Sequence, residues 1–277
     1  MKRLGLVVVA LLGLTACGKQ TVATGGGTSV TYSTSPSSLV VRVDTTGGFV
    51  PVETVFTNLP IVSIYGDGSV ITSGPVPMIY PGPVVPNLLV RKLDTQGMQA
   101  VLTAAQDAGI LTDPIDYGQP PVADVPDTVV TVNANEKSYT QSANALGGDF
   151  GTDNLTPAQI EARDELSKFV DSMTDLETLV GAEHIGPEQP YTITGWRLRA
   201  TAVDQLPTGE PAPTVVPWPI ASLPLASIGD CTAVTDAATA KQVTDTMSKA
   251  NQLTYFTDAG RTYQVLVRPL LPDEASC

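Results

Sequence analysis

Apolar and polar residues alternate with a period of two in several separate stretches, which is the pattern of half-buried β-strands. The first such strand begins at Leu39 and ends before Gly47. A second is expected from about 53 to 65, interrupted at Pro60, where proline marks an edge or a bulge. The turn sequence Gly66-Asp67-Gly68 then returns the chain into a strand over 69–72.

The same pattern predicts two later hairpins, one over 128–143 and one over 253–268. Further strands are expected at 88–93 and 191–203. Between the first strands and these elements, residues 75–86 hold five prolines in twelve positions, and this segment is predicted to be an extended loop.

Three segments instead show helical spacing and start signals. One begins with Asp94 or Thr95 as its cap and stops at Gly109. The second begins with Thr156 and Pro157, since proline suits the first helical turn. The third runs from Asp236 to about Ala250. The sequence therefore predicts an α+β fold of antiparallel sheets with about three helices.

A helix followed by a hairpin occurs at 94–143 and again at 236–268. Two related halves and a chance recurrence both account for it. We expect two parts packed on each other, an N-terminal α+β part over 39–188 and a C-terminal one over 189–277.

The N-terminus has a different character. A charged start, Met1-Lys2-Arg3, precedes an apolar run from Leu4 to Leu14, which is too short to span a bilayer. The sequence Leu14-Thr15-Ala16-Cys17 resembles the lipobox of bacterial lipoproteins. The resemblance implies that residues 1–16 are a signal peptide and that Cys17 carries the acyl anchor. The overlapping G-x-x-x-x-G-K string lacks the Ser or Thr and the helix of a phosphate-binding loop, so a nucleotide site is not expected.

The segment 17–38 is rich in Gly, Ser and Thr, which predicts a flexible tether. The formal net charge of the whole chain is −13, and removal of Lys2 and Arg3 makes it −15. This charge argues against nucleic acid as a partner and against broad electrostatic docking on anionic lipid.

Two of the three cysteines remain after Cys17. Cys231 and Cys277 are predicted to form a disulfide outside the cytoplasm, with free thiols or a metal pair as the alternative. The chain has a single histidine, His184, so neither a Ser–His catalytic pair nor a structural zinc site is expected. The acidic loop 148–154 lacks the spacing of a calcium loop. No catalytic residue, metal or cofactor is predicted.

Aromatic side chains are the remaining candidates for ligand contact, and Trp218, Trp196 and Tyr80 are the possible contact residues. Trp218 stands between two prolines, so the stiff backbone could present its ring. The alternative is that the ring folds back over the core.

Four separated motifs resemble uncharacterised bacterial secreted lipoproteins of unknown function. They are the hairpin string from Leu59-Pro60 to Ile64-Tyr65-Gly66-Asp67-Gly68, then Tyr191, then Pro217-Trp218-Pro219, and the closing run 268–274 before the last cysteine. This resemblance implies no catalytic residue.

We therefore predict a lipoprotein anchored to the cell membrane on its extracytoplasmic face. Its expected role in the cell envelope is structural or non-catalytic binding, with an envelope protein or cell-wall glycan as partner. One alternative is a small-molecule or glycan binder with a cleft between the two parts, near 181–190. The other is a hydrolase that uses two carboxylates.

Overall fold

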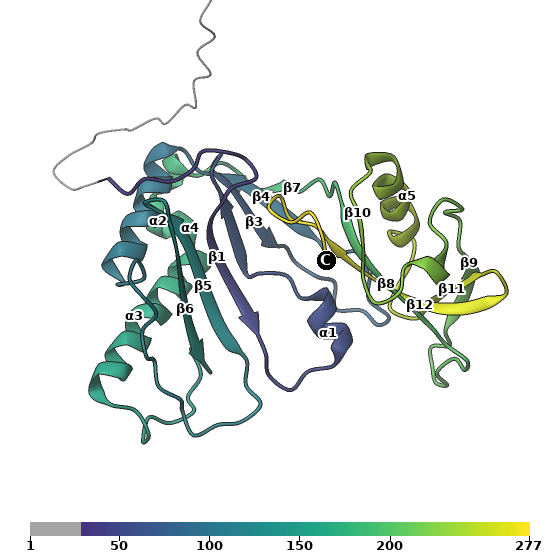
Figure 1. Ribbon diagram of the computed structural model, residues 1–277, viewed down its shortest axis with the longest axis horizontal. Coiled ribbons are helices and arrows are strands. Elements are labelled where there is room, and N and C mark those ends of the chain that lie inside the picture. The colour runs from purple at the N-terminus through teal and green to yellow at the C-terminus, as the bar shows by residue number, and fades with distance from the viewer. Residues whose placement is uncertain (1–28) are drawn as a thin grey trace, which may run out of the picture.

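The computed structural model describes residues 29–277, and its larger part is a seven-stranded antiparallel sheet (Figure 1). The strand order is β6-β5-β1-β2-β3-β4-β7. Strand β1 therefore pairs with β2 on one side and with β5 on the other. The strands are β1 Leu39–Thr46, β2 Val62–Tyr65, β3 Ser69–Ser73, β4 Leu88–Lys92, β5 Asp127–Ala134, β6 Lys137–Asn144 and β7 Gln189–Pro190.

Three helices cover one face of this first sheet, on the left in Figure 1. The predicted capping residues Asp94 and Thr156 both cap their helices. The Asp94 side chain accepts a hydrogen bond from the Gly97 N–H at 2.8 Å, and Thr156 and Gln159 form a capping box. The covering helices are α2 Thr95–Asp107, α3 Pro157–Thr174 and α4 Leu176–Val180, followed by the short 3₁₀ turn η1 Ala182–His184.

The C-terminal residues form a second sheet of five strands in the order β10-β8-β12-β11-β9. Strand β9 runs parallel to β11, and the other pairs are antiparallel. Helix α5 (Ala237–Met247) buries Val243 and Met247 in the core of this sheet. The strands are β8 Trp196–Ala202, β9 Thr214–Pro217, β10 Thr232–Val234, β11 Thr254–Asp258 and β12 Arg261–Pro269, with a 3₁₀ turn η2 at Leu225–Ser227.

The predicted α+β class with antiparallel sheets is confirmed, but one predicted strand is wrong. Residues 53–65 do not form one interrupted strand: α1 (Val52–Thr57) comes first, and β2 begins only at Val62. The helix–hairpin order does recur, as α2-β5-β6 and α5-β11-β12. The two hairpins take different places, because β6 is a sheet edge while β12 is the central strand of its sheet.

The predicted tether requires correction for its last ten residues. Val30 exposes only 4% of its surface and belongs to the first core. The Thr31 N–H donates to the Asn135 side chain at 3.0 Å, and the Asn135 N–H donates to the Thr31 carbonyl at 2.8 Å. Residues 29–38 are thus part of the body, and the prediction for 17–28 lies outside the described residues.

The boundary between the two parts also differs from the expected one at 188/189. β7 belongs to the first sheet, and each part contributes a segment to the other. Leu271 of the C-terminal tail is buried against Tyr65 on the face of the first sheet opposite the helices. In return, the loop after β3 exchanges hydrogen bonds between Gly82 and Gln252, so it is attached to the second part.

Candidate functional site

The predicted acylation site, Cys17, lies outside the described residues. The part of the chain that the structure describes contains no helix of sufficient length and apolarity to cross a bilayer.

The predicted disulfide between Cys231 and Cys277 is confirmed, with a Cα–Cα distance of 6.1 Å. It joins the last residue of the chain to the residue just before β10. The C-terminal tail is therefore held covalently to the second sheet while it packs against the first.

Two of the three predicted ligand-contact residues are core residues instead. Trp196 is fully buried, and its ring N–H donates to the Thr244 hydroxyl at 3.0 Å. Trp218 exposes 9% of its surface, donates to the Leu223 carbonyl at 2.8 Å and meets Phe256 edge to face at 5.1 Å. Buried indoles with satisfied N–H groups have no surface to offer a ligand. The stiff Pro-Trp-Pro backbone turns its ring inward.

The third residue, Tyr80, is exposed and belongs to an apolar loop. It exposes 67% of its surface. Its neighbours Val76 and Ile79 each expose 65% of their surface, and Met78 is fully exposed. Because four large apolar side chains project from one loop, this is a concentrated apolar surface.

A second exposed apolar segment surrounds α1, a short helix without a buried residue. Phe49 exposes 88% of its surface, and Val52 and Val55 expose about six-tenths. Glu53 is the only charged residue between 47 and 61. In an amphipathic helix such residues face the protein core. In α1 they are exposed, so this helix presents an apolar surface.

The sheet register places these two segments at the same end of the first sheet. Residues 47–61 connect the end of β1 to the start of β2, where Val43 faces Val62. Residues 74–87 connect the end of β3 to the start of β4, where Ser73 faces Leu88. We call residues 49–55 and 75–80 together the apolar end. In Figure 1 α1 lies at the lower end of β1, whereas the described chain begins near the top.

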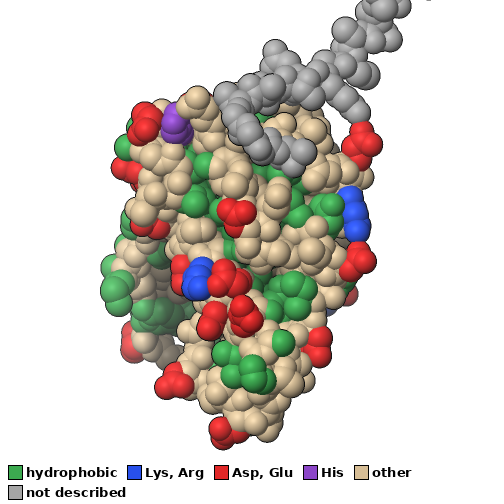
Figure 2. Space-filling view, turned by 90° about the vertical axis from the view of Figure 1, so that its left-hand side faces the viewer, with side chains coloured by type: hydrophobic (Ala, Val, Ile, Leu, Met, Phe, Trp, Pro, Cys, Tyr) green, Lys and Arg blue, Asp and Glu red, His purple; other side chains and the backbone are tan. Residues whose placement is uncertain are grey.

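The described part of the chain is acidic as a whole. Lys2, Arg3 and Lys19 are the only charged residues before Ser29, so residues 29–277 carry a formal net charge of −16, three units below that of the whole chain. Figure 2 shows acidic side chains spread over the side covered by helices, with few basic ones between them. The apolar end is therefore a weakly charged region of a strongly anionic body.

The region 181–190, where the alternative hypothesis placed a cleft, is a surface connection in which only Ile185 is buried. The Nδ1 atom of His184 lies 2.9 Å from the Asp94 carboxylate, at the start of α2. This hydrogen bond raises the pKa of His184 above its ordinary value. The backbone continues through β7 onto the edge of the first sheet. The histidine thus helps to fix the start of a helix.

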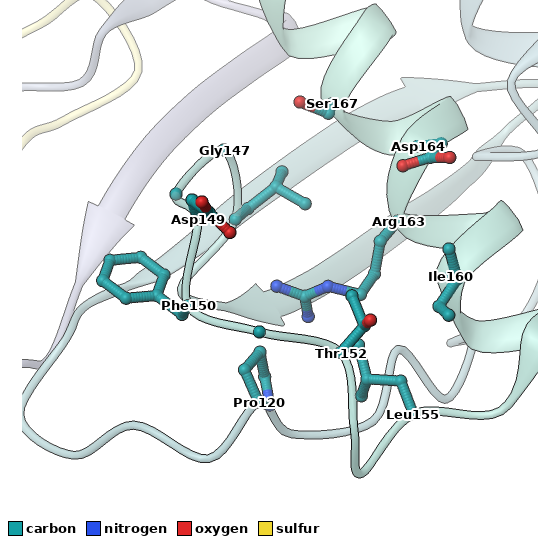
Figure 3. A pocket seen from close by; sticks show the side chains of 13 residues that line it. Pro120, Gly147, Asp149, Phe150, Thr152, Leu155, Ile160, Arg163, Asp164 and Ser167 are labelled. Atoms are coloured by element: carbon teal, nitrogen blue, oxygen red, sulfur yellow. The ribbon is translucent and has the colours of Figure 1, made fainter.

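A hollow of about 180 Å³ lies elsewhere, between α3 and the loop that precedes it (Figure 3). Arg163 from α3 points into it and exposes only 9% of its surface. Asp149 and Asp164 also line it, while its apolar wall is formed by Pro120, Leu146, Phe150, Leu155 and Ile160. We call this feature the Arg163 hollow.

The carboxyl groups give the hydrolase alternative no support. A general acid needs a carboxyl group whose pKa is raised. Among the described residues, the carboxyl groups with a shifted pKa are all shifted downward. Backbone hydrogen bonds lower the pKa of Asp94 and Asp236, and Lys137 lowers that of Asp113.

Comparison with known proteins adds no relative: no family model matches the chain, and neither does any curated protein or solved structure. The resemblance of its four motifs to secreted lipoproteins stays a prediction.

Most of the apolar end and the whole Arg163 hollow were not predicted from the sequence. One signal was available for the first: residues 75–80 read Pro-Val-Pro-Met-Ile-Tyr, and a loop that proline keeps out of the sheet has no sheet face in which to bury such residues. For the hollow no local signal exists, because one arginine among helix residues is ordinary.

Proposed function

We propose that this protein is a lipid-anchored, extracytoplasmic lipoprotein that binds another envelope protein through its apolar end, without catalysis. The observation that carries the proposal is the exposure of large apolar side chains by two neighbouring connections of the first sheet. Monomeric proteins rarely leave large contiguous apolar surface in water, and such surface is typical of protein docking sites.

The position of the anchor favours a protein over the bilayer as the occupant. Residue 29 lies beside the tip of the β5–β6 hairpin, because Thr31 is bonded to Asn135 there. The eight residues of β5, roughly 26 Å, separate this tip from the apolar end, where Asp127 pairs with Thr46. The 12 residues from Cys17 to Ser29 span at most about 40 Å when fully extended. The anchor is thus attached at the end of the sheet opposite the apolar end.

Charge further defines the partner. A body with a net charge of −16 is repelled by anionic lipid and by nucleic acid, while basic residues around an apolar centre would attract it. The chemistry therefore fits a folded protein with an apolar contact surface and a basic rim.

The anchor is tested by Cys17→Ser. We expect this variant to leave the membrane fraction and to lose labelling by a radioactive or clickable fatty acid, while secretion continues. A variant that still takes up label would refute the acyl anchor. Thr21→Ser, a conservative change in the same segment, is the control.

Docking is tested in intact cells with a photocrosslinking residue at position 55 or 78, and at exposed Lys168 on α3 as the control. We expect the same discrete heterologous adduct from positions 55 and 78 and none from position 168. The adduct should disappear when Ile79→Ser is added. Adducts of twice the monomer mass would show self-association instead, lipid adducts would show a bilayer contact, and different adducts from the two positions would refute a shared docking site.

A further inference from the structure

Arg163 is a buried cation without an anionic partner. Its Nη2 donates to the carbonyls of Asn144 and Ala145 at 2.7 and 2.9 Å, and its Nη1 donates to the Tyr117 carbonyl at 3.4 Å. Among residues 29–277 no carboxylate forms an ion pair with it, and burial alone lowers its pKa. Buried charges in proteins are ordinarily paired, because removing an ion from water is costly.

Among residues 29–277 the other buried arginine, Arg268, shows the usual arrangement. Arg268 exposes 6% of its surface and forms a two-pronged ion pair with Glu274, with bonds of 2.6 and 3.1 Å. Arg163 has nearly the same exposure, yet its three bonds all end on neutral carbonyls. These bonds use at most three of the five N–H groups of a guanidinium.

The space beside Arg163 is suited to a ligand with one charged and one apolar part. Figure 3 shows the guanidinium pointing between Phe150 of the loop and the side chains of Thr152 and Pro120. The volume of the hollow, about 180 Å³, exceeds the roughly 150 Å³ that accommodates a benzene molecule in an apolar cavity. The apolar residues on its wall would cover the uncharged part of such a ligand.

We propose that the Arg163 hollow is a binding site for a carboxylate carried by a small apolar molecule or by the end of a peptide. The carboxylate would accept hydrogen bonds from the N–H groups of Arg163 that are not bonded to backbone carbonyls, and its charge would compensate the buried cation. Asp149 and Asp164, which also line the hollow, oppose a second negative charge, so the site would select monoanions. This inference is independent of the docking function, because the hollow lies against α3 and the apolar end lies at α1 and the β3–β4 loop.

The test is an NMR titration of the mature chain carrying Cys17→Ser, with benzoate and with its neutral analogue benzamide. We expect saturable benzoate shifts for the amides of Gly147 and Gly151 and for the Nε–H of Arg163. Benzamide should bind at least about tenfold more weakly, since it lacks the charge-assisted bonds. Equal shifts with both compounds, or shifts that never saturate, would overturn the proposal.

Variants and a second ligand pair sharpen the result. Arg163→Met should abolish the saturable shifts, while Arg261→Met, at an exposed arginine of β12, should keep them. If Arg163→Met does not fold, the wild-type comparison of benzoate with benzamide decides alone. If acetyl-phenylalanine binds more tightly than both benzoate and acetyl-phenylalanine amide, the ligand is the carboxyl terminus of a peptide. If benzoate binds more tightly than acetyl-phenylalanine, the ligand is a small free acid.

Discussion

Removing one hydroxyl group at Tyr65 should measurably weaken the attachment of the C-terminal tail to the first sheet. The Tyr65 side chain is fully buried. Its hydroxyl donates to the Asp273 carboxylate at 2.8 Å and accepts from Arg42 at 3.2 Å. Burial, and then the bond to Asp273, raise the pKa of Tyr65 far above its ordinary value, so the hydroxyl stays a donor.

The magnitude follows from what Tyr65→Phe leaves behind. The ring still packs against Ile71 and Leu271, and Arg42 still reaches Asp273 at 2.8 Å. Two hydrogen bonds to charged groups are lost, one to Asp273 and one from Arg42, and a single bond of this kind typically contributes about 1.5–3 kcal/mol. Because the ion pair persists, we expect the lower part of this range, about 1.5–2 kcal/mol.

The assay is equilibrium unfolding in urea followed by two signals. Tryptophan fluorescence reports only the second core, which holds both Trp196 and Trp218, whereas far-ultraviolet circular dichroism reports both sheets. For a slope near 3 kcal/mol per molar, the midpoint of Tyr65→Phe should fall by roughly 0.5 M. Tyr80→Phe, at an exposed tyrosine, should stay within about 0.5 kcal/mol of the wild type. A Tyr65→Phe variant as stable as that control would refute the role of the hydroxyl.

Three further expectations concern the chain ends and the start of α2. Gly66→Ala should expose residues 29–38 to limited proteolysis, because a Cβ there would lie only 1.9 Å from the Ser33 carbonyl oxygen; unchanged protection would contradict the packing. Cys277→Ser should cost about 3–4 kcal/mol in the chain-entropy model, measured as a loss of unfolding free energy; an unchanged midpoint would contradict it. The bond to Asp94 raises the pKa of His184, so its contribution to stability should be complete below pH ~6.5 and be lost as pH rises through the folded pKa; Asp94→Asn should lower that pKa in an NMR titration, and no change would contradict the pairing.

The elements that the sequence predicted well are those specified by neighbouring residues. Capping at Asp94, Thr156 and Asp236 marks the starts of the three longer helices, because each side chain bonds an N–H three residues ahead. The turn at Asn135-Glu136 likewise holds both residues at positive φ, as a tight hairpin requires. Such signals act within a few residues and are legible without the fold.

The features that the sequence did not predict depend on contacts between distant residues. Val52–Thr57 has the β-branched composition of a strand, but no neighbouring strand pairs with it, and it forms α1. Trp218 is buried against Phe256, which is distant in the sequence, and the pairing of Arg42 with Asp273 spans 231 residues. At the Arg163 hollow, three backbone carbonyls converge on one guanidinium, which no spacing in the sequence reveals.

The hairpin Tyr65-Gly66-Asp67-Gly68 has a larger role in the fold than its turn signal indicates. Tyr65 holds the C-terminal tail through Asp273, whereas Gly66 leaves room for the N-terminal segment at Ser33. A Cβ at Gly68 would collide with the Leu93 carbonyl, just before α2. Residues of one turn thus accommodate the segment 29–38, the C-terminal tail and the entry to a helix. Because the tail is also bonded to the second sheet through Cys277, loosening this hairpin should destabilise both sheets together, whereas a cavity at Val243 of α5 should first weaken only the second.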